Sequence, residues 1–224
     1  STLSLTFPFY SVVQRSTSTI FYNLNSGTAG STQPTEYGIS SSSQTLTVSN
    51  PSRIGYNFNG WTVSWTDSDY SGTLPSVSGT TLTIPANTYG NITLTANWSA
   101  RNYNITYNLG GGSHGSTHPS TYTFSSSRQT KTISNPSRTG YTFNSWTLSR
   151  SSYGGSTPTI SGTTLSIPAS SYGNIILTAN WSANTYYIVY NGNGATSGSM
   201  ANTTCSYGST YTLTANAFVR TGYN

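Results

Sequence analysis

An internal repeat with a period of about 85 residues constrains the fold of this chain more than any other feature. Residues 50–61 return with few changes as residues 135–146, and residues 94–100 return unchanged as residues 177–183. A repeat of this period indicates that one small structural unit is strung into an array. Arrays serve reach, stiffness or assembly more often than catalysis, so an enzyme site is not expected in this chain.

The copies predict the domain boundaries. Residues 18–100 form repeat 1, residues 102–183 form repeat 2, and residues 184–224 form an incomplete repeat 3. Residues 1–17 are predicted to hold a strand, because residues 1–5 resemble residues 163–167. This strand is either the tail of a preceding unit or a donor strand for another molecule. A third reading is that the chain is a window on a longer array whose ends carry no meaning.

The composition favours an ordered β protein with a neutral surface. Only 5% of the residues are charged, against roughly 25% in an average soluble domain, while 13% are aromatic. The net charge of +5 comes from arginines scattered along the chain, and without a basic cluster a nucleic-acid partner is not expected. No apolar run approaches the roughly 18 residues that a membrane-spanning helix needs. A single cysteine, Cys205, excludes a disulfide within the chain.

Alternating apolar and polar residues predict strands throughout. Ile92 and Leu94 alternate with threonines, and Ile105 and Tyr107 alternate with asparagine and threonine, which is the pattern of a strand with one buried face. The predicted class is therefore mostly β, with the repeats arranged end to end. Residues 85–90 and 168–173 are the exception, because proline at the first position and glycine at the last favour a single helical turn.

Recurring aromatic residues are the predicted core. Residues 56 and 58 share one face of a strand, and a bulge at Asn59 and Gly60 would turn Trp61 to the same side. Trp98, in the last strand of the repeat, is the predicted partner of Trp61. The predicted core residues are Tyr56, Phe58, Trp61 and Trp98 in repeat 1, with Tyr141, Phe143, Trp146 and Trp181 in repeat 2.

These motifs resemble the Listeria–Bacteroides repeat, also called the internalin B-repeat type. The resemblance rests on a strand ending in Gly-Gly (residues 107–111), a Pro-x-x-x-Gly-Tyr-x-Phe-x-Gly-Trp block (51–61, with 136–146) and a closing Leu-x-Ala-x-Trp strand (94–98, with 177–181). Ser145 replaces the glycine before Trp146. The resemblance implies a small β-grasp-like unit in exported bacterial surface proteins that serve adhesion or act as stalks. It implies no common catalytic residues.

Few residues suggest catalysis or metal binding. The three acids are Glu36, Asp67 and Asp69. Asp67 and Asp69 lie two residues apart in one loop, which favours solvated acids over a glycosidase pair positioned across a cleft. A weak calcium contact in this loop is the other reading, although calcium takes six to eight oxygen ligands. His114 and His118 could share a metal ion, with an ordinary surface loop as the other reading. No enzyme activity, cofactor or resident metal is expected.

Two further side chains have structural interpretations. Cys205 lies in repeat 3, whereas every glutamine that could form a thioester with it lies elsewhere, so a free thiol is expected. Lys131 occupies the position of Leu46 in an otherwise apolar strand pattern. A charge at such a place predicts an edge strand that is protected against pairing with other chains.

Aromatic and glycosylation signals suggest contact with sugars. Trp65 and Tyr70 lie in the long loop of repeat 1, outside the repeated core pattern, and form a candidate platform for carbohydrate. Sequons for N-glycosylation occur at Asn91, Asn97, Asn104, Asn180 and Asn202, and they matter only if the producing cell glycosylates.

Two functions are predicted from these features. The first is a non-enzymatic structural module of an extracellular or cell-surface bacterial fibre, stalk or adhesin, with neighbouring repeats or other copies of the chain as partners. Polymerisation head to tail by strand complementation is a sharper form of this prediction. The alternative is an adhesin module that binds surface carbohydrates or a receptor.

Overall fold

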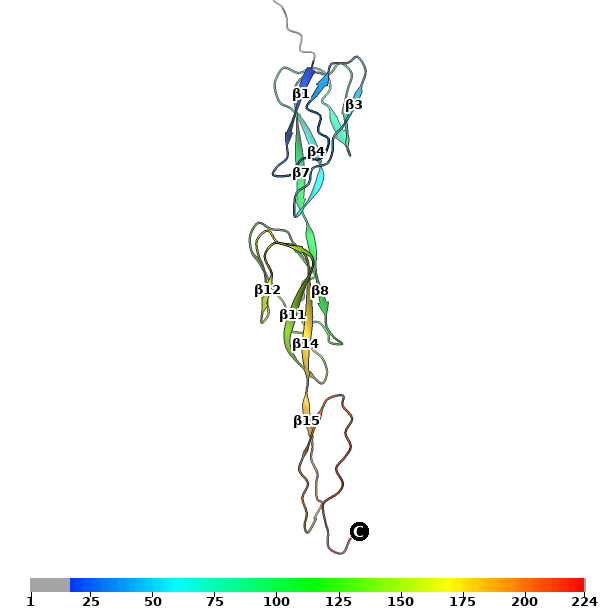
Figure 1. Ribbon diagram of the computed structural model, residues 1–224, viewed down its shortest axis with the longest axis vertical. Coiled ribbons are helices and arrows are strands. Elements are labelled where there is room, and N and C mark those ends of the chain that lie inside the picture. The colour runs from blue at the N-terminus through cyan, green and yellow to red at the C-terminus, as the bar shows by residue number, and fades with distance from the viewer. Residues whose placement is uncertain (1–16, 224) are drawn as a thin grey trace, which may run out of the picture. The chain divides into compact units, whose positions relative to one another are not determined.

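The chain folds into strands, turns and loops. The computed structural model describes residues 17–223, and this part of the chain contains sixteen strands and no helix (Figure 1). It divides between Arg101 and Asn102 into two compact units. Repeat 1 lies in the first unit, and repeats 2 and 3 lie in the second. The predicted strand in residues 1–17 lies outside the described residues except for Thr17.

Unit 1 is built on a mixed four-stranded sheet with the order β2-β1-β7-β4. Its first and last strands, β1 and β7, are parallel neighbours at the centre, with Ile20 opposite Ile92. A parallel pair needs a long crossover, and here the crossover contains the rest of the unit. The strands of unit 1 are β1 (Thr17–Asn23), β2 (Glu36–Gly38), β3 (Gln44–Thr47), β4 (Tyr56–Trp65), β5 (Ser76–Ser78), β6 (Thr81–Ile84) and β7 (Ile92–Ala100).

A small antiparallel sheet with the order β3-β6-β5 covers one face of the larger sheet. Leu82 and Ile84 on β6 pack against Ile92 and Leu94 on β7, and all four are fully buried. A β-grasp unit has a helix in this covering position. Alternating threonines and aliphatic residues between residues 44 and 84 favour strands instead, so the unit closes as two packed sheets.

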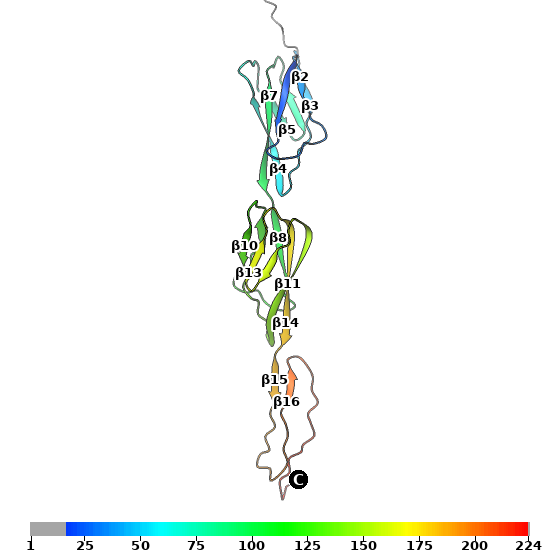
Figure 2. The same ribbon diagram turned by 60° about the vertical axis from the view of Figure 1, so that its left-hand side comes forward.

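Repeat 2 has the same architecture (Figure 2). Its larger sheet has the order β11-β14-β8-β9 with β14 parallel to β8, and its covering sheet has the order β10-β13-β12. The strands are β8 (Asn102–Asn108), β9 (Thr121–Thr123), β10 (Gln129–Thr132), β11 (Tyr141–Gly154), β12 (Thr159–Ser161), β13 (Thr164–Ile167) and β14 (Tyr172–Ala183).

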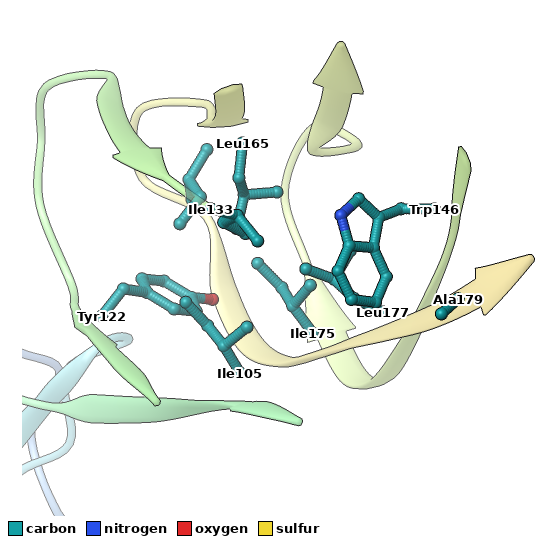
Figure 3. Packing of buried hydrophobic residues seen from close by; sticks show 9 residues of the cluster. Ile105, Tyr122, Ile133, Trp146, Leu165, Ile175, Leu177 and Ala179 are labelled. Atoms are coloured by element: carbon teal, nitrogen blue, oxygen red, sulfur yellow. The ribbon is translucent and has the colours of Figure 1, made fainter. Parts of the chain in front are cut away.

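The core of repeat 2 lies between its two sheets (Figure 3). Leu165 on the covering sheet meets Ile175 and Leu177 on the larger sheet, and all three are fully buried. Tyr122 and Trp146 close the two sides of this cluster, with exposed fractions of 1% and 9%. Burying an aliphatic side chain of this size contributes about 1.5–3 kcal/mol, so this cluster is the main source of stability in the unit.

The predicted bulge occurs in both repeats. In β4, Phe58 pairs with Trp98 and Trp61 pairs with Ala96, so Asn59 and Gly60 together face one residue of β7. The extra residue places Phe58 and Trp61 on the same face, as the sequence pattern required. β11 carries the equivalent shift between Phe143 and Ser145. It forms there although serine replaces the glycine.

The predicted helical turns are wrong. The structure has a tight turn at Asn87 in the first segment and at Ser170 in the second, both with a φ of 56°, and residues 172 and 173 already belong to β14. A residue in the left-handed region stops a right-handed helical turn. Each turn instead forms a backbone hydrogen bond to a neighbouring loop. Asn87 N donates to Ser40 O at 2.7 Å, and Ser170 N donates to Ser125 O at 2.8 Å.

Repeat 3 has only the beginning of this fold. β15 (Thr185–Ile188) and β16 (Thr203–Ser206) pair antiparallel and correspond to β8 and β9. Residues 207–223 add an isolated bridge between Ser197 and Val219 but no further strand. Within residues 184–223 no hydrophobic side chain is buried, and Tyr187 and Val189 are 65% and 70% exposed. This segment therefore lacks a counterpart of the closing strands β7 and β14.

Candidate functional site

The most distinctive side-chain arrangement is a row of four aromatic residues, which we call the aromatic row. In unit 1 it consists of Tyr22, Trp61, Phe58 and Trp98. Ring centroids are 5.7 Å apart for Tyr22 and Trp61, 5.3 Å for Phe58 and Trp61, and 5.4 Å for Phe58 and Trp98, all edge to face. The sequence predicted direct pairing of the two indoles, and Phe58 in fact contacts both of them. Edge-to-face pairs contribute about 0.5–1.5 kcal/mol beyond their buried area.

Repeat 2 reproduces the aromatic row with Tyr107, Trp146, Phe143 and Trp181. The corresponding centroid distances are 5.7, 5.2 and 5.6 Å. The aromatic row therefore has the same geometry in both repeats. A core contact must form in every repeat, whereas a ligand-binding surface need not, so the recurrence indicates a structural role.

The indole from the last strand of each repeat, Trp98 in repeat 1 and Trp181 in repeat 2, covers the loop that follows the first strand of that repeat. Trp98 Nε1 donates to Leu24 O at 3.0 Å, and Trp181 Nε1 donates to Leu109 O at 2.9 Å. The ring lies so close to the loop that a Cβ on Gly27 or Gly112 would come within 2.6 Å of the indole. Sequence reasoning missed these glycines, although their recurrence at the same distance from the first strand is a usable signal.

The other indole of each row, Trp61 in repeat 1 and Trp146 in repeat 2, has no hydrogen-bond partner. The Nε1 atoms of Trp61 and Trp146 are buried without a hydrogen-bond partner. A buried donor without a partner costs about 1–3 kcal/mol. These two rings therefore stabilise the core only through their buried apolar area and their packing. Trp98 and Trp181 in addition donate a hydrogen bond to a backbone carbonyl.

The tyrosines of the rows are half-buried and donate hydrogen bonds through their hydroxyl groups. Tyr22 Oη donates to Pro34 O and Tyr107 Oη donates to Pro119 O, both at 2.8 Å. Burial raises the pKa of each of these two phenols to about 12. A second pair, Tyr37 and Tyr122, donates to the carbonyls of the glycine turns after β6 and β13, and burial also raises their pKa values.

The remaining predicted core residues, Tyr56 and Tyr141, are half-buried at the end of each repeat. The guanidinium carbon of Arg53 lies 3.8 Å from the ring centre of Tyr56, and that of Arg138 lies 3.6 Å from the ring centre of Tyr141. Stacked guanidinium groups gain about 0.5–1 kcal/mol at exposed sites. The sequence marked this Arg-x-Gly-Tyr segment as repeated but gave no role to its arginine.

The candidate sugar platform is a stacked pair. The rings of Trp65 and Tyr70 are 4.6 Å apart and nearly parallel, at 10°. Trp65 is half-buried against the core and uses one face for this stack, while Tyr70 is 48% exposed. In repeat 2 the same two positions hold Arg150 and Tyr153, with the guanidinium 5.3 Å from the ring centre. The pair braces the loop in both repeats, and only the outer face of Tyr70 remains open to a ligand.

The candidate metal-binding residues do not assemble into a larger group. Among residues 17–223, no three acids, histidines or cysteines lie close enough to share an ion. His114 and His118 stack on each other at 4.2 Å, and Tyr107 meets the edge of His114 at 5.2 Å. Two ligands are fewer than the four of a structural zinc site, so the pair fits the surface-loop interpretation better.

The acids and the remaining polar candidates have local structural roles. Asp67 Oδ2 accepts a 2.7 Å hydrogen bond from Asn91, whose own Oδ1 accepts from Thr19 N. Asp69 and Glu36 are exposed. The Cys205 thiol is free and half-buried on β16. Lys131 lies on β10, which is the last strand of its sheet and therefore an edge, as predicted.

Each complete repeat is thus a closed pair of sheets whose recurring residues build its core and its loop contacts. Fold and repeat together define a tandem β-repeat protein. The family model of the Listeria-Bacteroides repeat domain matches residues 19–97, 103–179 and 186–224, and the chain belongs to this family. The family is a surface-associated repeat. No curated protein and no solved structure matches the chain. No helix in residues 17–223 is long and apolar enough to cross a membrane.

Proposed function

We propose that this chain is a non-enzymatic structural module of an extracellular bacterial stalk, fibre or adhesin. The observation that carries the proposal is the link between repeats. β7 ends at Ala100 and β8 begins at Asn102, and β14 and β15 are likewise separated by a single residue, Asn184. The link residue bonds back to the preceding repeat, since Arg101 N donates to Gly55 O and Asn184 N donates to Gly140 O, both at 2.8 Å. A link of one residue contains no flexible linker segment, which suits an array that carries mechanical load.

Surface chemistry supports the same role. Serine, threonine and asparagine side chains bond to one another across strands, for example Asn97 to Thr62 at 2.9 Å and Asn180 to Thr147 at 2.8 Å. The strength of these surface hydrogen bonds depends little on pH and salt concentration, because the surface has few charged groups to titrate or to screen. These properties suit a module that works outside the cell.

The stalk function is tested by small-angle X-ray scattering on chains with one, two and three complete repeats. We expect the maximum dimension to grow by a constant increment with each repeat. The control carries eight Gly-Ser residues inserted after Ala100, which convert the link into a flexible coil. Compact particles whose dimension grows more slowly than the repeat number would contradict the proposal.

Strand complementation is the finer form of the proposal. Repeat 3 has a hollow of about 360 Å³ lined by Gly192, Ala195 and Phe218. The N–H of Ala195 bonds to Gly192 O as the N–H of Gly112 bonds to Leu109 O, so the hollow corresponds to the seat of Trp181. Ala195 takes the place of Gly112, and its methyl group makes the hollow narrower than the site that accepts the indole of Trp181 in repeat 2. A donor side chain smaller than an indole would suit this seat.

Electron microscopy of the intact chain and of a chain that begins at Thr17 tests this assembly. Filaments of the intact chain, and monomers of the shortened one, are the expected result. Filaments of unchanged length after removal of residues 1–16 would refute donor-strand assembly and leave the stalk function standing.

A carbohydrate-binding adhesin module is the second candidate. The half-exposed ring of Tyr70, held rigid by Trp65, is the observation that favours it. A glycan array probed with the intact chain should give a reproducible signal that Tyr70→Ser abolishes. Tyr153→Ser, at the equivalent position of repeat 2, serves as the matched control and should leave the signal unchanged. Absence of any signal would remove this candidate.

A further inference from the structure

The net positive charge of this chain lies in its second half. Residues 1–101 carry three acids and three arginines, which cancel, whereas residues 102–224 carry four arginines, one lysine and no acid. All four of these arginines have partners, since three stack on tyrosine rings and Arg128 donates to Ser166 Oγ at 3.0 Å. Lys131 has no hydrogen-bond, ion-pair or ring partner in the part of the chain that the structure describes. Its ammonium group is therefore open to an anion from outside the chain.

Lys131 lines a hollow at the open edge of β10. The hollow has a volume of about 440 Å³ and lies between loop 116–119 and residues 130–132 of β10. Lys131 pairs with the fully buried Leu165 and is itself half-buried, so its stem covers the margin of the core while the ammonium group stays in solvent. Serine and threonine residues from both walls line the same hollow. The hollow therefore combines one unpaired cation with several hydroxyl groups.

The loop wall of the hollow is held in place by its own hydrogen bonds. Ser134 N donates to Thr117 O at 2.8 Å, and Thr117 N donates to Ser134 Oγ at 3.1 Å. His118 Nδ1 donates to Gly115 O at 3.0 Å, and the ring of His114 stacks on His118 with the centroids 4.2 Å apart. A wall that is already ordered loses little conformational entropy when a ligand binds to it.

The chemistry of the hollow is specific to repeat 2. A carbonyl oxygen can only accept, so the hydrogen of the neutral His118 ring is on Nδ1, and Nε2 is left to accept a hydrogen bond from a hydroxyl group. The ammonium group of Lys131 supplies three N–H donors, which suit a carboxylate. Gln33 and Leu46 occupy the equivalent positions in repeat 1, so that repeat has neither group.

We propose that the hollow between loop 116–119 and β10 binds an acidic sugar, that is, a hexose ring that carries a carboxylate. Lys131 binds the carboxylate, His118 Nε2 accepts from a ring hydroxyl, and the serine and threonine hydroxyls bond the rest of the ring. Because residues 102–224 contain no acid, a polymer of such sugars meets no like charge in these residues. The site goes beyond the structural role proposed above, and it is separate from the ring of Tyr70, which belongs to unit 1.

Titration of the full ¹⁵N-labelled chain with trigalacturonate, followed by ¹⁵N correlation spectra, tests the site. The measurement is made at low ionic strength, because salt screens the attraction of an exposed ammonium group. Amide signals of Thr117, His118 and residues 130–132 should shift and reach saturation. The methyl ester of the same trisaccharide lacks the charge, and acetate lacks the sugar ring, so both should bind more weakly. Equal shifts from the ester, or acetate that binds as tightly as the trisaccharide, would overturn the proposal.

Matched variants assign the binding to the hollow. Lys131→Gln should weaken binding about tenfold, because it removes one charge-assisted hydrogen bond, and His118→Gln, which introduces the residue of repeat 1, should also weaken it. Arg128→Gln removes an exposed positive charge three residues away and should change the affinity little. Equal losses from Lys131→Gln and Arg128→Gln would show non-specific attraction by charge and would overturn the proposal. Tyr70→Ser should leave this affinity unchanged, so the two carbohydrate sites are decided separately, and the scattering measurement decides the stalk function.

Discussion

At the residue scale, a few glycines and aromatic rings decide how each repeat closes. Composition and spacing predicted which aromatic residues matter, because they recur in both copies. They could not predict which ring contacts which, since contacts such as Trp98 with Leu24 join positions 74 residues apart in the sequence. Pairing of the two indoles was the natural expectation, and Phe58 contacts both because the bulge brings it to their side.

The glycine beneath the second indole offers a direct test. Gly112→Ala should lower the unfolding free energy of repeat 2 by about 1–3 kcal/mol, because the new Cβ would lie 2.6 Å from the ring of Trp181. Urea unfolding followed by circular dichroism measures the change. Ser113→Ala is the matched control, and in a Trp181→Phe background the cost of Gly112→Ala should shrink. An equal cost in both backgrounds would show that the indole is not the cause.

Two half-buried phenols predict how stability responds to alkaline pH. Burial raises the pKa of Tyr22 and Tyr107 from 10.0 to about 12, so the folded chain keeps these protons where the unfolded chain has lost them. Unfolding then releases protons between pH 10 and 12, and the unfolding free energy falls as the pH rises through this window.

Thermal unfolding at pH 9 and at pH 11.5 measures this effect. Tyr22→Phe with Tyr107→Phe should lower stability at pH 9, because two hydrogen bonds are lost, and should reduce the further loss at pH 11.5. Tyr187→Phe, at a 65% exposed position, is the control and should leave the pH dependence unchanged. An identical pH dependence in the double variant would contradict the assignment.

At the scale of elements, alternation predicted the strands and failed at the turns. Strands such as β7 and β14 follow from their two-residue period, since every second side chain enters the core. Their pairing was beyond the sequence, because the parallel partners β1 and β7 begin 75 residues apart. The two turns expected to be helical contain an asparagine and a serine in left-handed conformation, which proline and glycine spacing does not reveal.

Lys131 on the edge strand β10 tests whether the repeat is protected against wrong pairing. Leu46, its counterpart on β3, faces Leu82, and Lys131 faces Leu165 in the same way. Lys131→Leu should raise the tendency to aggregate, because an apolar edge without charge accepts further strands. Light scattering during slow heating measures the onset of aggregation. Lys131→Arg should behave as the wild type, and an unchanged onset for Lys131→Leu would show that the lysine has no such role.

At the scale of the whole molecule, the repeated sequence makes two separate cores that are buried independently. The buried residues of unit 1 and those of unit 2 form separate clusters. Each unit also has its own copy of the aromatic row. In such an array each repeat depends mainly on its own packing and on its nearest neighbour. This organisation was accessible from the sequence, because the period itself marks where one unit stops and the next begins.

Independent cores predict that damage stays local. Trp61→Ala should cost about 3–5 kcal/mol, which is most of the stability of so small a unit, and should unfold residues 17–101. Amide signals of the buried β14 residues Ile175 and Leu177 should keep their native chemical shifts in a ¹⁵N correlation spectrum. Trp146→Ala is the mirror experiment and should spare Ile92 and Leu94 while unit 2 unfolds. Loss of native signals from both units after either substitution would mean that they fold as one cooperative body, and the account of the chain as an array of self-sufficient repeats would then fail.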